Sequence, residues 1–263
     1  MTGSLGKLCR KGSAAGSMYR DKKIGVVVPA YNEEPHIAVV LEGMPDFVDR
    51  VYVVDDASTD RTADIVRAFA VHDVRVRPLS HAHNRGVGAA IVTGYRRCLA
   101  DDVDIAAVMA GDNQMDGVEL PRLLDPVVDG VADYSKGDRT SRPEHLVGMS
   151  LWRRSGNWLL KWLTRIAVGN MRVMDPQNGY TAASRELLAV LPLARLYPRY
   201  GYCNQLLLWV SLLRREVAEV PMPARYLGER SKIRYSVYIP KVSWLLLRLF
   251  LLRITGRLGS CGT

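Results

Sequence analysis

The sequence lacks several features that mark specialised protein classes. It has only four cysteines among 263 residues, and none of them stands in a C-x-x-C or other metal-ligand spacing. We therefore expect neither a zinc site nor a disulfide framework, and a reducing, cytosolic setting fits best. The sequence has no internal repeat, and its composition, 48% hydrophobic and 24% charged, is that of an ordinary globular protein.

Long uncharged apolar runs are also absent. Residues 1–23 are basic and rich in Gly and Ser without an apolar core, which excludes a secretory signal and predicts a flexible tail. The most apolar stretch, residues 237–254, contains three basic residues and Pro240. Because a spanning helix needs about 20 mostly apolar residues, this stretch predicts an interfacial or packed helix.

Acidic residues are scarce in the second half of the chain. Residues 24–134 hold nine basic and nineteen acidic residues, whereas residues 135–263 hold twenty-one basic and seven acidic ones. A basic segment of this size favours a polyanionic partner, such as nucleic acid, a membrane surface or a phosphate group.

The first 110 residues alternate strand and helix patterns. Buried strands are predicted at residues 24–30, 51–54 and 105–109, and a half-exposed strand at 74–79. Helices are predicted at 33–43, 58–72 and 86–99, the second with Ser58 or Thr59 as its N-cap. This order predicts an α/β fold with a mostly parallel sheet, whose ligands bind beyond the carboxyl ends of the strands.

A helix predicted at residues 150–168 has two contrasting sides. Its charged residues gather on one side and its Trp and Leu residues on the other; the charged ones are Arg153, Arg154, Lys161 and Arg165. Two interpretations stay open: a membrane-surface helix, or a helix packed on the sheet with a solvated charged edge. A nucleic-acid partner is disfavoured, because the basic residues are interleaved with this Trp/Leu face and no reader motif is present.

Polar motifs follow three of the predicted strands. The pair Asp55-Asp56 offers acceptors for ribose or base groups, and the Gly-rich stretch 84–90 offers backbone N–H groups for a phosphate. That stretch follows the third strand and has an incomplete G-x-G-x-x-G spacing, which disfavours a nicotinamide enzyme. Asp112-Asn113-Gln114 supplies oxygen ligands for Mg²⁺ or Mn²⁺. Each motif alone is equally typical of an ordinary turn.

Taken in order, the motifs of this chain form a more specific pattern. They are Pro29–Glu34, Val54–Asp60, Asn84–Ala89, Gly111–Gln114, Lys136–Arg139, Asp175–Tyr180 and Gly228–Ile233. With this pattern the chain resembles a family 2 glycosyltransferase of the GT-A fold, in the branch of dolichol- and polyprenyl-phosphate sugar synthases. The resemblance implies a tail at 1–22, a GT-A domain at 23–235 and, at 236–263, an amphipathic helix that is a candidate for membrane association.

The resemblance also implies roles for individual residues. Those expected to bind the nucleotide are Pro29, Tyr31, Glu33, Asp55, Asp56, Asn84 and Gly86. Asp112 and Gln114 match the metal positions, whereas Ala110 stands where the family usually has a first Asp. Those expected on the acceptor and diphosphate side are Arg139, one of Arg153 and Arg154, Asp175 with Gln177, and the loop residues Ser231 and Lys232. Among all of these, Asp112, Arg139, Asp175 and Lys232 are the expected catalytic residues.

The expected reaction follows from this resemblance. A hexose would pass with inversion from a nucleotide-diphosphate sugar, GDP-mannose or UDP-glucose, to a polyprenyl phosphate, with Mg²⁺ or Mn²⁺ as cofactor. The protein would be cytoplasmic and peripheral at the inner face of the cell membrane. Two alternatives remain: a glycosyltransferase with a soluble or secondary-metabolite acceptor, and a non-catalytic nucleotide-sugar-binding protein in which Ala110 marks a degraded site.

Overall fold

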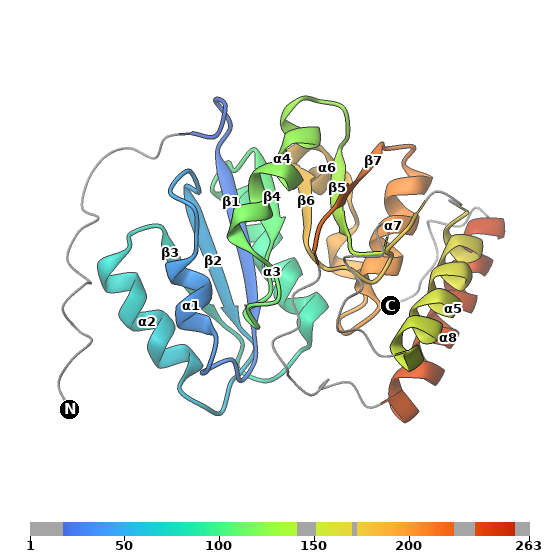
Figure 1. Cartoon of the computed structure of the whole chain (residues 1–263), viewed down its shortest axis with the longest axis horizontal. Coiled ribbons are helices and arrows are strands. Elements are labelled where there is room, and N and C mark those ends of the chain that lie inside the picture. The colour runs from blue at the N-terminus through green and yellow to red at the C-terminus, as the bar shows by residue number, and fades with distance from the viewer. Residues whose placement is uncertain (1–17, 141–150, 170–172, 224–234, 256–263) are drawn as a thin grey trace.

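Seven strands form one mixed, mostly parallel sheet at the centre of the molecule (Figure 1). The structure, a computed structural model, describes residues 18–140, 151–169, 173–223 and 235–255. The strand order is β3-β2-β1-β4-β6-β5-β7, and β6 runs antiparallel to both of its neighbours. The strands are β1 (Ile24–Ala30), β2 (Arg50–Asp55), β3 (Val76–Ser80), β4 (Ile105–Val108), β5 (Tyr134–Asp138), β6 (Thr181–Ser184) and β7 (Val217–Pro221). The predicted α/β class is confirmed.

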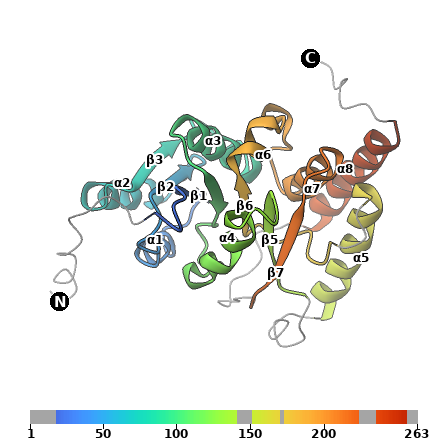
Figure 2. The same cartoon turned by 90° about the horizontal axis from the view of Figure 1, so that it is seen from above.

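Helices cover both faces of the sheet (Figure 2). They are α1 (Ile37–Glu42), α2 (Thr62–His72), α3 (Val87–Ala100), α4 (Leu120–Val128), α5 (Leu151–Val168), α6 (Arg185–Val190), α7 (Tyr202–Leu212) and α8 (Tyr235–Thr255). Val26 and Val28 join a core with α1, α2 and α4, whereas Val27 joins the opposite core with α3, α6 and α7. Because both faces of the sheet are covered, the sequences of the central strands are nearly continuous apolar runs.

The predicted start of the second helix is wrong. The helix α2 begins at Thr62, and neither Ser58 nor Thr59 caps it. The Asp60 carboxylate accepts hydrogen bonds from the Thr62 N–H and hydroxyl at 3.0 and 2.6 Å, and Ser58 Oγ accepts one from the Asn32 N–H at 2.9 Å. Residues 58–61 therefore continue a loop after β2 that is tied to the loop after β1.

The second half of the chain adds a layer of two helices outside α7. Both α5 and α8 pack against α7 and against each other, at the end of the sheet farthest from β3 (Figures 1 and 2). Thr164, Ala167 and Val168 of α5 are buried, as are Val242, Leu246 and Leu249 of α8. No helix within the described ranges is long and apolar enough to cross a membrane.

Helices α5 and α8 both expose large apolar side chains. The exposed apolar side chains are Trp158, Leu159, Trp162, Leu163 and Ile166 on α5, and Trp244, Leu247, Leu251 and Ile254 on α8. We call these nine residues the apolar face. Lys241, Ser243 and Arg248 of α8 are exposed as well. One interpretation of the helix predicted at residues 150–168 was that it packs its Trp/Leu side on the sheet. That interpretation is wrong, because this side of α5 is exposed.

Candidate active site

The carboxyl ends of β1, β2 and β4 bring three loops to one edge of the sheet (Figure 1). The Gly111 N–H donates to the Pro29 carbonyl at 3.1 Å, and the Asp56 N–H donates to the Ala30 carbonyl at 2.9 Å. A Cβ atom on Gly111 would lie 3.3 Å from that Pro29 carbonyl oxygen, so glycine permits the close approach. The loops that carry Tyr31, Asp55 and Asp112 thus converge at this edge.

The loops after β1 and β2 are locked together beside a buried carboxylate. Thr59 N–H donates to the Asn32 side-chain oxygen at 2.8 Å, and Glu33 N–H donates to the Thr62 hydroxyl at 2.8 Å. Asp55 is 7% exposed, and both of its oxygens share the Ser58 N–H, at 3.2 and 3.4 Å. Since a carboxylate has about four acceptor positions, Asp55 retains capacity for hydroxyl or base N–H donors at this edge.

The other predicted residues after β1 differ in exposure. Tyr31 is 41% exposed, so its ring is available to stack on a planar group. Glu33 is buried at the turn that precedes α1, and Pro29 is buried inside β1. A direct nucleotide contact by any of the three stays a prediction.

The second aspartate of the pair, Asp56, has a structural environment. Its carboxylate accepts the Arg85 N–H at 2.8 Å and the Gly86 N–H at 2.7 Å, and it lies 2.7 Å from His81 Nδ1. The Asn84 amide donates to the Asp56 carbonyl at 3.3 Å. Asp56 therefore holds the turn before α3 from inside the protein. His81, which the sequence analysis did not single out, completes this arrangement, and its place in the His-rich run after β3 was the available signal.

The Gly-rich turn is explained by packing. Gly86 has a φ of +95°, and the Ala89 N–H donates to the Pro198 carbonyl at 3.1 Å. A Cβ atom on Gly88 would lie 2.2 Å from the Tyr197 carbonyl oxygen. The N–H groups of Gly86 and Ala89, interpreted from sequence as part of a phosphate cradle, are thus bonded to Asp56 and to the 197–198 turn instead.

The loop after β4 offers a small set of oxygen ligands. Asp112 is partly exposed and its Oδ1 accepts the Gln114 N–H at 3.1 Å, while Asn113 has a φ of +59° and Gln114 is exposed. No group of three or more His, Cys, Asp or Glu that could hold a metal ion occurs among the residues that the structure describes. One carboxylate fits Mg²⁺ or Mn²⁺ if substrate oxygens and water supply most of the other ligands.

A partly buried ion pair lies after β5, at the same edge. Arg139 Nε donates to Asp175 Oδ2 at 2.7 Å, Nη2 donates to Oδ1 at 3.2 Å, and the Arg139 N–H also donates to Oδ2 at 3.2 Å. Burial by itself would raise the pKa of Asp175, but the Arg139 guanidinium, with help from Lys136, holds that pKa below its usual value. The structure thus brings together two residues that were predicted on the acceptor side.

Three further residues fix the loop that carries Asp175. The fully buried Lys136 donates through Nζ to the Asp175 carbonyl. The Glu219 carboxylate accepts the Met174 N–H at 2.8 Å, and Arg165 Nε donates to the Val173 carbonyl at 2.7 Å. Burial raises the pKa of Glu219, although Lys136 opposes the shift. Glu219 lies on β7, far from the motifs in sequence, and only the β5–β7 pairing places it here.

The inward side of α5 carries positive charge toward this loop. Burial and the neighbouring Arg165 lower the pKa of Lys161, whereas Asp138, Glu219 and Asp175 act in the opposite direction. Gln177 donates to the Asn204 side-chain oxygen at 3.1 Å and so ties the same loop to α7. Lys161 and Arg165, spaced one turn apart on the basic side of the predicted helix, thus face the candidate site.

The structure does not describe the side chains of four of the predicted site residues. Ser231 and Lys232 lie outside the described residues, and Arg153 and Arg154 are placed only as positions on α5. Their roles stay predictions.

Comparison with known proteins shows which class of protein this sheet and edge define. A structure of glucosyl-3-phosphoglycerate synthase from Mycobacterium tuberculosis with phosphoglyceric acid matches with a TM-score of 0.65 and 25% identity, over 92% of this chain and 82% of that chain. The complex of the same enzyme with Mn²⁺, UDP-glucose and phosphoglyceric acid matches with a TM-score of 0.64 and 27% identity, over 89% and 80%. The fold is the GT-A fold of nucleotide-diphospho-sugar transferases.

The chain belongs to glycosyl transferase family 2, whose model matches residues 25–191. Among its relatives is the UDP-N-acetylglucosamine–dolichyl-phosphate N-acetylglucosaminyltransferase of Methanococcus voltae, 28% identical over 78% of this chain and 87% of the relative. Another is the undecaprenyl-phosphate mannosyltransferase of Micrococcus luteus, 29% identical over 79% of this chain and 86% of the relative. The protein is therefore a glycosyltransferase, as predicted.

Proposed function

We propose that this glycosyltransferase passes a hexose, mannose or glucose, from a nucleotide-diphosphate sugar to a polyprenyl phosphate, at the inner surface of the cell membrane. The observation that carries the proposal is the apolar face of α5 and α8. Helix α5 contributes to this face and also carries Lys161 and Arg165, which turn toward the candidate site. A soluble acceptor would require no such face, whereas a lipid acceptor must be taken from a membrane. The two relatives described above are named for polyprenyl-phosphate acceptors, which supports the same choice.

The donor is assigned to the edge formed by β1, β2 and β4. Asp55 has acceptor capacity for the nucleoside, and Tyr31 offers a ring beside it. Asp112 and Gln114 would hold a divalent ion together with the diphosphate. Such an ion, when bound, supplies positive charge beside the diphosphate as negative charge grows on the leaving group.

The acceptor is assigned to the side of Arg139 and α5. An oxygen of the lipid phosphate forms the bond to the anomeric carbon, while the bond from that carbon to the diphosphate breaks and the nucleoside diphosphate leaves. A phosphate monoester is already an anion near neutral pH, so its oxygen needs little help from a general base. The repulsion between this phosphate and the donor diphosphate must be offset. Arg139, which Asp175 holds in place, is suited to that task, together with Lys161 of α5, which interacts with Asp175.

The apolar face is suited to a membrane interface. Helices α5 and α8 contain no Asp or Glu, and between them they carry seven basic residues: Arg153, Arg154, Lys161, Arg165, Lys241, Arg248 and Arg253. Tryptophan and leucine on one side and Lys or Arg on the other are typical of helices that lie in the interface of anionic lipids.

The test is transfer of labelled sugar to a lipid. The purified protein is incubated with polyprenyl phosphate, Mn²⁺ or Mg²⁺, and labelled GDP-mannose, UDP-glucose or UDP-N-acetylglucosamine in turn. We expect an acid-labile product that extracts into organic solvent. Asp112→Asn should abolish it, whereas Asp64→Asn, a matched change at an exposed position on α2, should not. Absence of a lipid product with every donor would refute the proposal.

A second candidate is transfer to a small phosphorylated acceptor. It is favoured by the structural neighbours, which are named for transfer to phosphoglycerate. The same assay with 3-phosphoglycerate in place of the lipid decides between the two, because the product then stays in the aqueous phase.

A further inference from the structure

The edge strand β7 carries a single charged residue, Glu219. Strand β7 runs parallel to β5, and the register of the two strands places Glu219 beside Lys136. Paired residues of neighbouring strands project from the same face of a sheet. Both side chains reach one short loop, where Glu219 accepts the Met174 N–H and Lys136 donates to the Asp175 carbonyl.

Side chains hold this loop at four consecutive backbone groups. The Glu219 carboxylate accepts the Met174 N–H at 2.8 Å and the Asp175 N–H at 3.3 Å. The Thr140 hydroxyl donates to the Met174 carbonyl at 3.2 Å, and Lys136 Nζ donates to the Asp175 carbonyl. Hydrogen bonds from charged groups are stronger than those between neutral groups, so Glu219 and Lys136 together fix the backbone of Asp175.

The position of Asp175 in turn sets the orientation of Arg139. Both Nε and Nη2 of Arg139 donate to the Asp175 carboxylate, and such a two-point contact fixes the plane of the guanidinium group. The Asp175 side chain is 4% exposed and that of Arg139 is 26% exposed. Arg139 is therefore the member of the pair that a ligand reaches, whereas Asp175 and Glu219 act on it from inside.

The ionised form of Glu219 does not serve the stability of the fold. Burial raises the pKa of Glu219, Asp138 acts in the same direction, and Lys136 opposes them. Because the folded-state pKa lies above the unfolded value, the favourable contribution of Glu219 to stability exists in acid and is lost as the pH rises through the folded pKa. A carboxylate at this position is better explained by the loop that it holds.

From these observations we propose that Glu219 is a positioning residue for the acceptor. Glu219 holds the loop of Asp175, Asp175 aims Arg139, and Arg139 binds the acceptor phosphate. Glu219 thereby sets the affinity for a phosphate monoester, the group that both acceptor candidates share, and has no effect at the nucleotide edge formed by β1, β2 and β4. The inference rests on the proposed function for the assignment of the acceptor to Arg139.

The test is calorimetric titration of the full chain with two phosphate monoesters, farnesyl phosphate and 3-phosphoglycerate, one for each acceptor candidate. Glu219→Ala should weaken binding of the phosphate about tenfold, close to the loss of one charge-assisted hydrogen bond. Glu219→Gln should weaken it less, because its amide oxygen still accepts the Met174 N–H. Glu216→Gln, the same change at an exposed position just before β7, is the matched control and should bind as the unaltered protein does.

Two further measurements separate positioning from a general loss of structure. The affinity for UDP or GDP with Mn²⁺ should be the same in the Glu219 variants as in the unaltered protein. In an Arg139→Gln background, which itself weakens phosphate binding, Glu219→Ala should cause little further loss, because Glu219 acts through Arg139. Losses that add would mean that Glu219 acts elsewhere.

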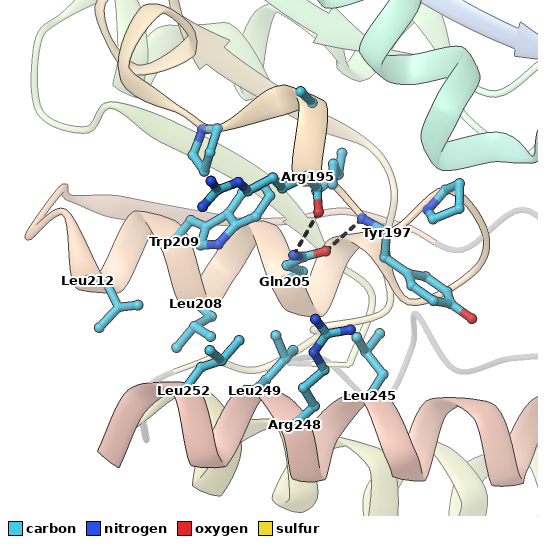
Figure 3. A pocket seen from close by; sticks show the side chains of 14 residues that line it. Arg195, Tyr197, Gln205, Leu208, Trp209, Leu212, Leu245, Arg248, Leu249 and Leu252 are labelled. Atoms are coloured by element: carbon cyan, nitrogen blue, oxygen red, sulfur yellow. Dashed lines mark hydrogen bonds between the residues drawn. The ribbon is translucent and has the colours of Figure 1, made fainter. Parts of the chain in front are cut away.

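The hydrocarbon chain of farnesyl phosphate requires its own control. A cleft of about 260 Å³ lies between α7, α8 and the turn at residues 192–198, and its lining includes Leu208, Leu249 and Leu252 (Figure 3). Neither Arg139 nor Glu219 lines this cleft. Farnesol, which lacks the phosphate, measures binding of the chain alone, and 3-phosphoglycerate has no such chain.

The proposal is overturned if neither Glu219 variant weakens phosphate binding, if the losses from Glu219→Ala and Arg139→Gln add, if nucleotide affinity falls by the same factor, or if the unaltered protein binds neither monoester. Thermal melts identify variants that do not fold, and Glu219→Gln carries the test if Glu219→Ala is one of them. Failure of the proposed function is read separately, from the absence of a glycosylated lipid in the transfer assay, because these titrations do not depend on sugar transfer.

Discussion

Two tryptophans of the apolar face should control how tightly the protein binds membranes. Trp158 on α5 and Trp244 on α8 are 62% and 68% exposed. Replacing both with serine removes apolar surface from the side assigned to the membrane and leaves the core untouched. The perturbation therefore tests the surface and not the fold.

The expected magnitude follows from the exposed area. An aromatic side chain buries roughly 200 Å² when fully covered, so about 130 Å² of each indole is open to solvent. At about 25 cal/mol per Å², complete removal from water is worth about 3 kcal/mol for each tryptophan. A helix in the interface immerses its apolar face only partly, so we take about half of that value. For both residues together this predicts a weakening of about a hundredfold, since 1.4 kcal/mol is about tenfold.

The assay is co-sedimentation with vesicles that contain anionic lipid, read as a partition coefficient. The control is Val71→Ser/Val131→Ser, which removes equally exposed apolar side chains, 77% and 69% exposed, from other parts of the surface. It should partition as the unaltered protein does. If the tryptophan variant and the control bind equally well, or if the apolar face proves to join two copies of the chain, the reasoning is refuted.

Three further predictions concern the candidate site. Asp175→Asn should abolish transfer and lower stability by about 1–2 kcal/mol, because Arg139 loses its partner but is itself partly open to solvent. Since the folded pKa of Asp175 lies below its unfolded value, its contribution is present above about pH 4 and lost as the pH falls; thermal melts of the variant should therefore show a weaker loss of stability in acid. Gly88→Ala should destabilise the protein by about 2 kcal/mol in a denaturant titration, because the new Cβ meets the 197–198 backbone. Ala110→Asp should lower the Mn²⁺ concentration needed for half-maximal activity, and an unchanged requirement would show that position 110 does not face the ion.

Local patterns in the chain were enough to predict four of the seven strands, β1 to β4, but not β5, β6 or β7. The run Ile24–Ala30 is β-branched and apolar because it is buried on both faces, and that chemistry is visible without coordinates. The start of α2 was not predictable in the same way. Ser58 has a hydroxyl suited to an N-cap. That hydroxyl instead accepts a hydrogen bond from the Asn32 N–H, in another loop.

The candidate site was predicted in part. Asp55 and Asp112 could be singled out because one ends the buried strand β2 and the other lies in the loop after the buried strand β4, and in a parallel sheet such positions meet at one edge. Asp56 shares the same local pattern but is turned inward to His81 and to the backbone before α3. Nothing in a dipeptide of two aspartates indicates which of the two side chains turns inward to the backbone before α3.

The sequence by itself determined the α/β architecture, the family and the division between an acidic first half and a basic second half. The architecture and the charge division depend on periodicity and composition, whereas the family was indicated by the order of short motifs along the chain. Only the tertiary structure decided that Lys136 and Glu219 hold the Asp175 loop and that the Trp side of α5 faces outward. Those facts depend on which distant segments pack together, and packing is fixed by the shape of the whole core.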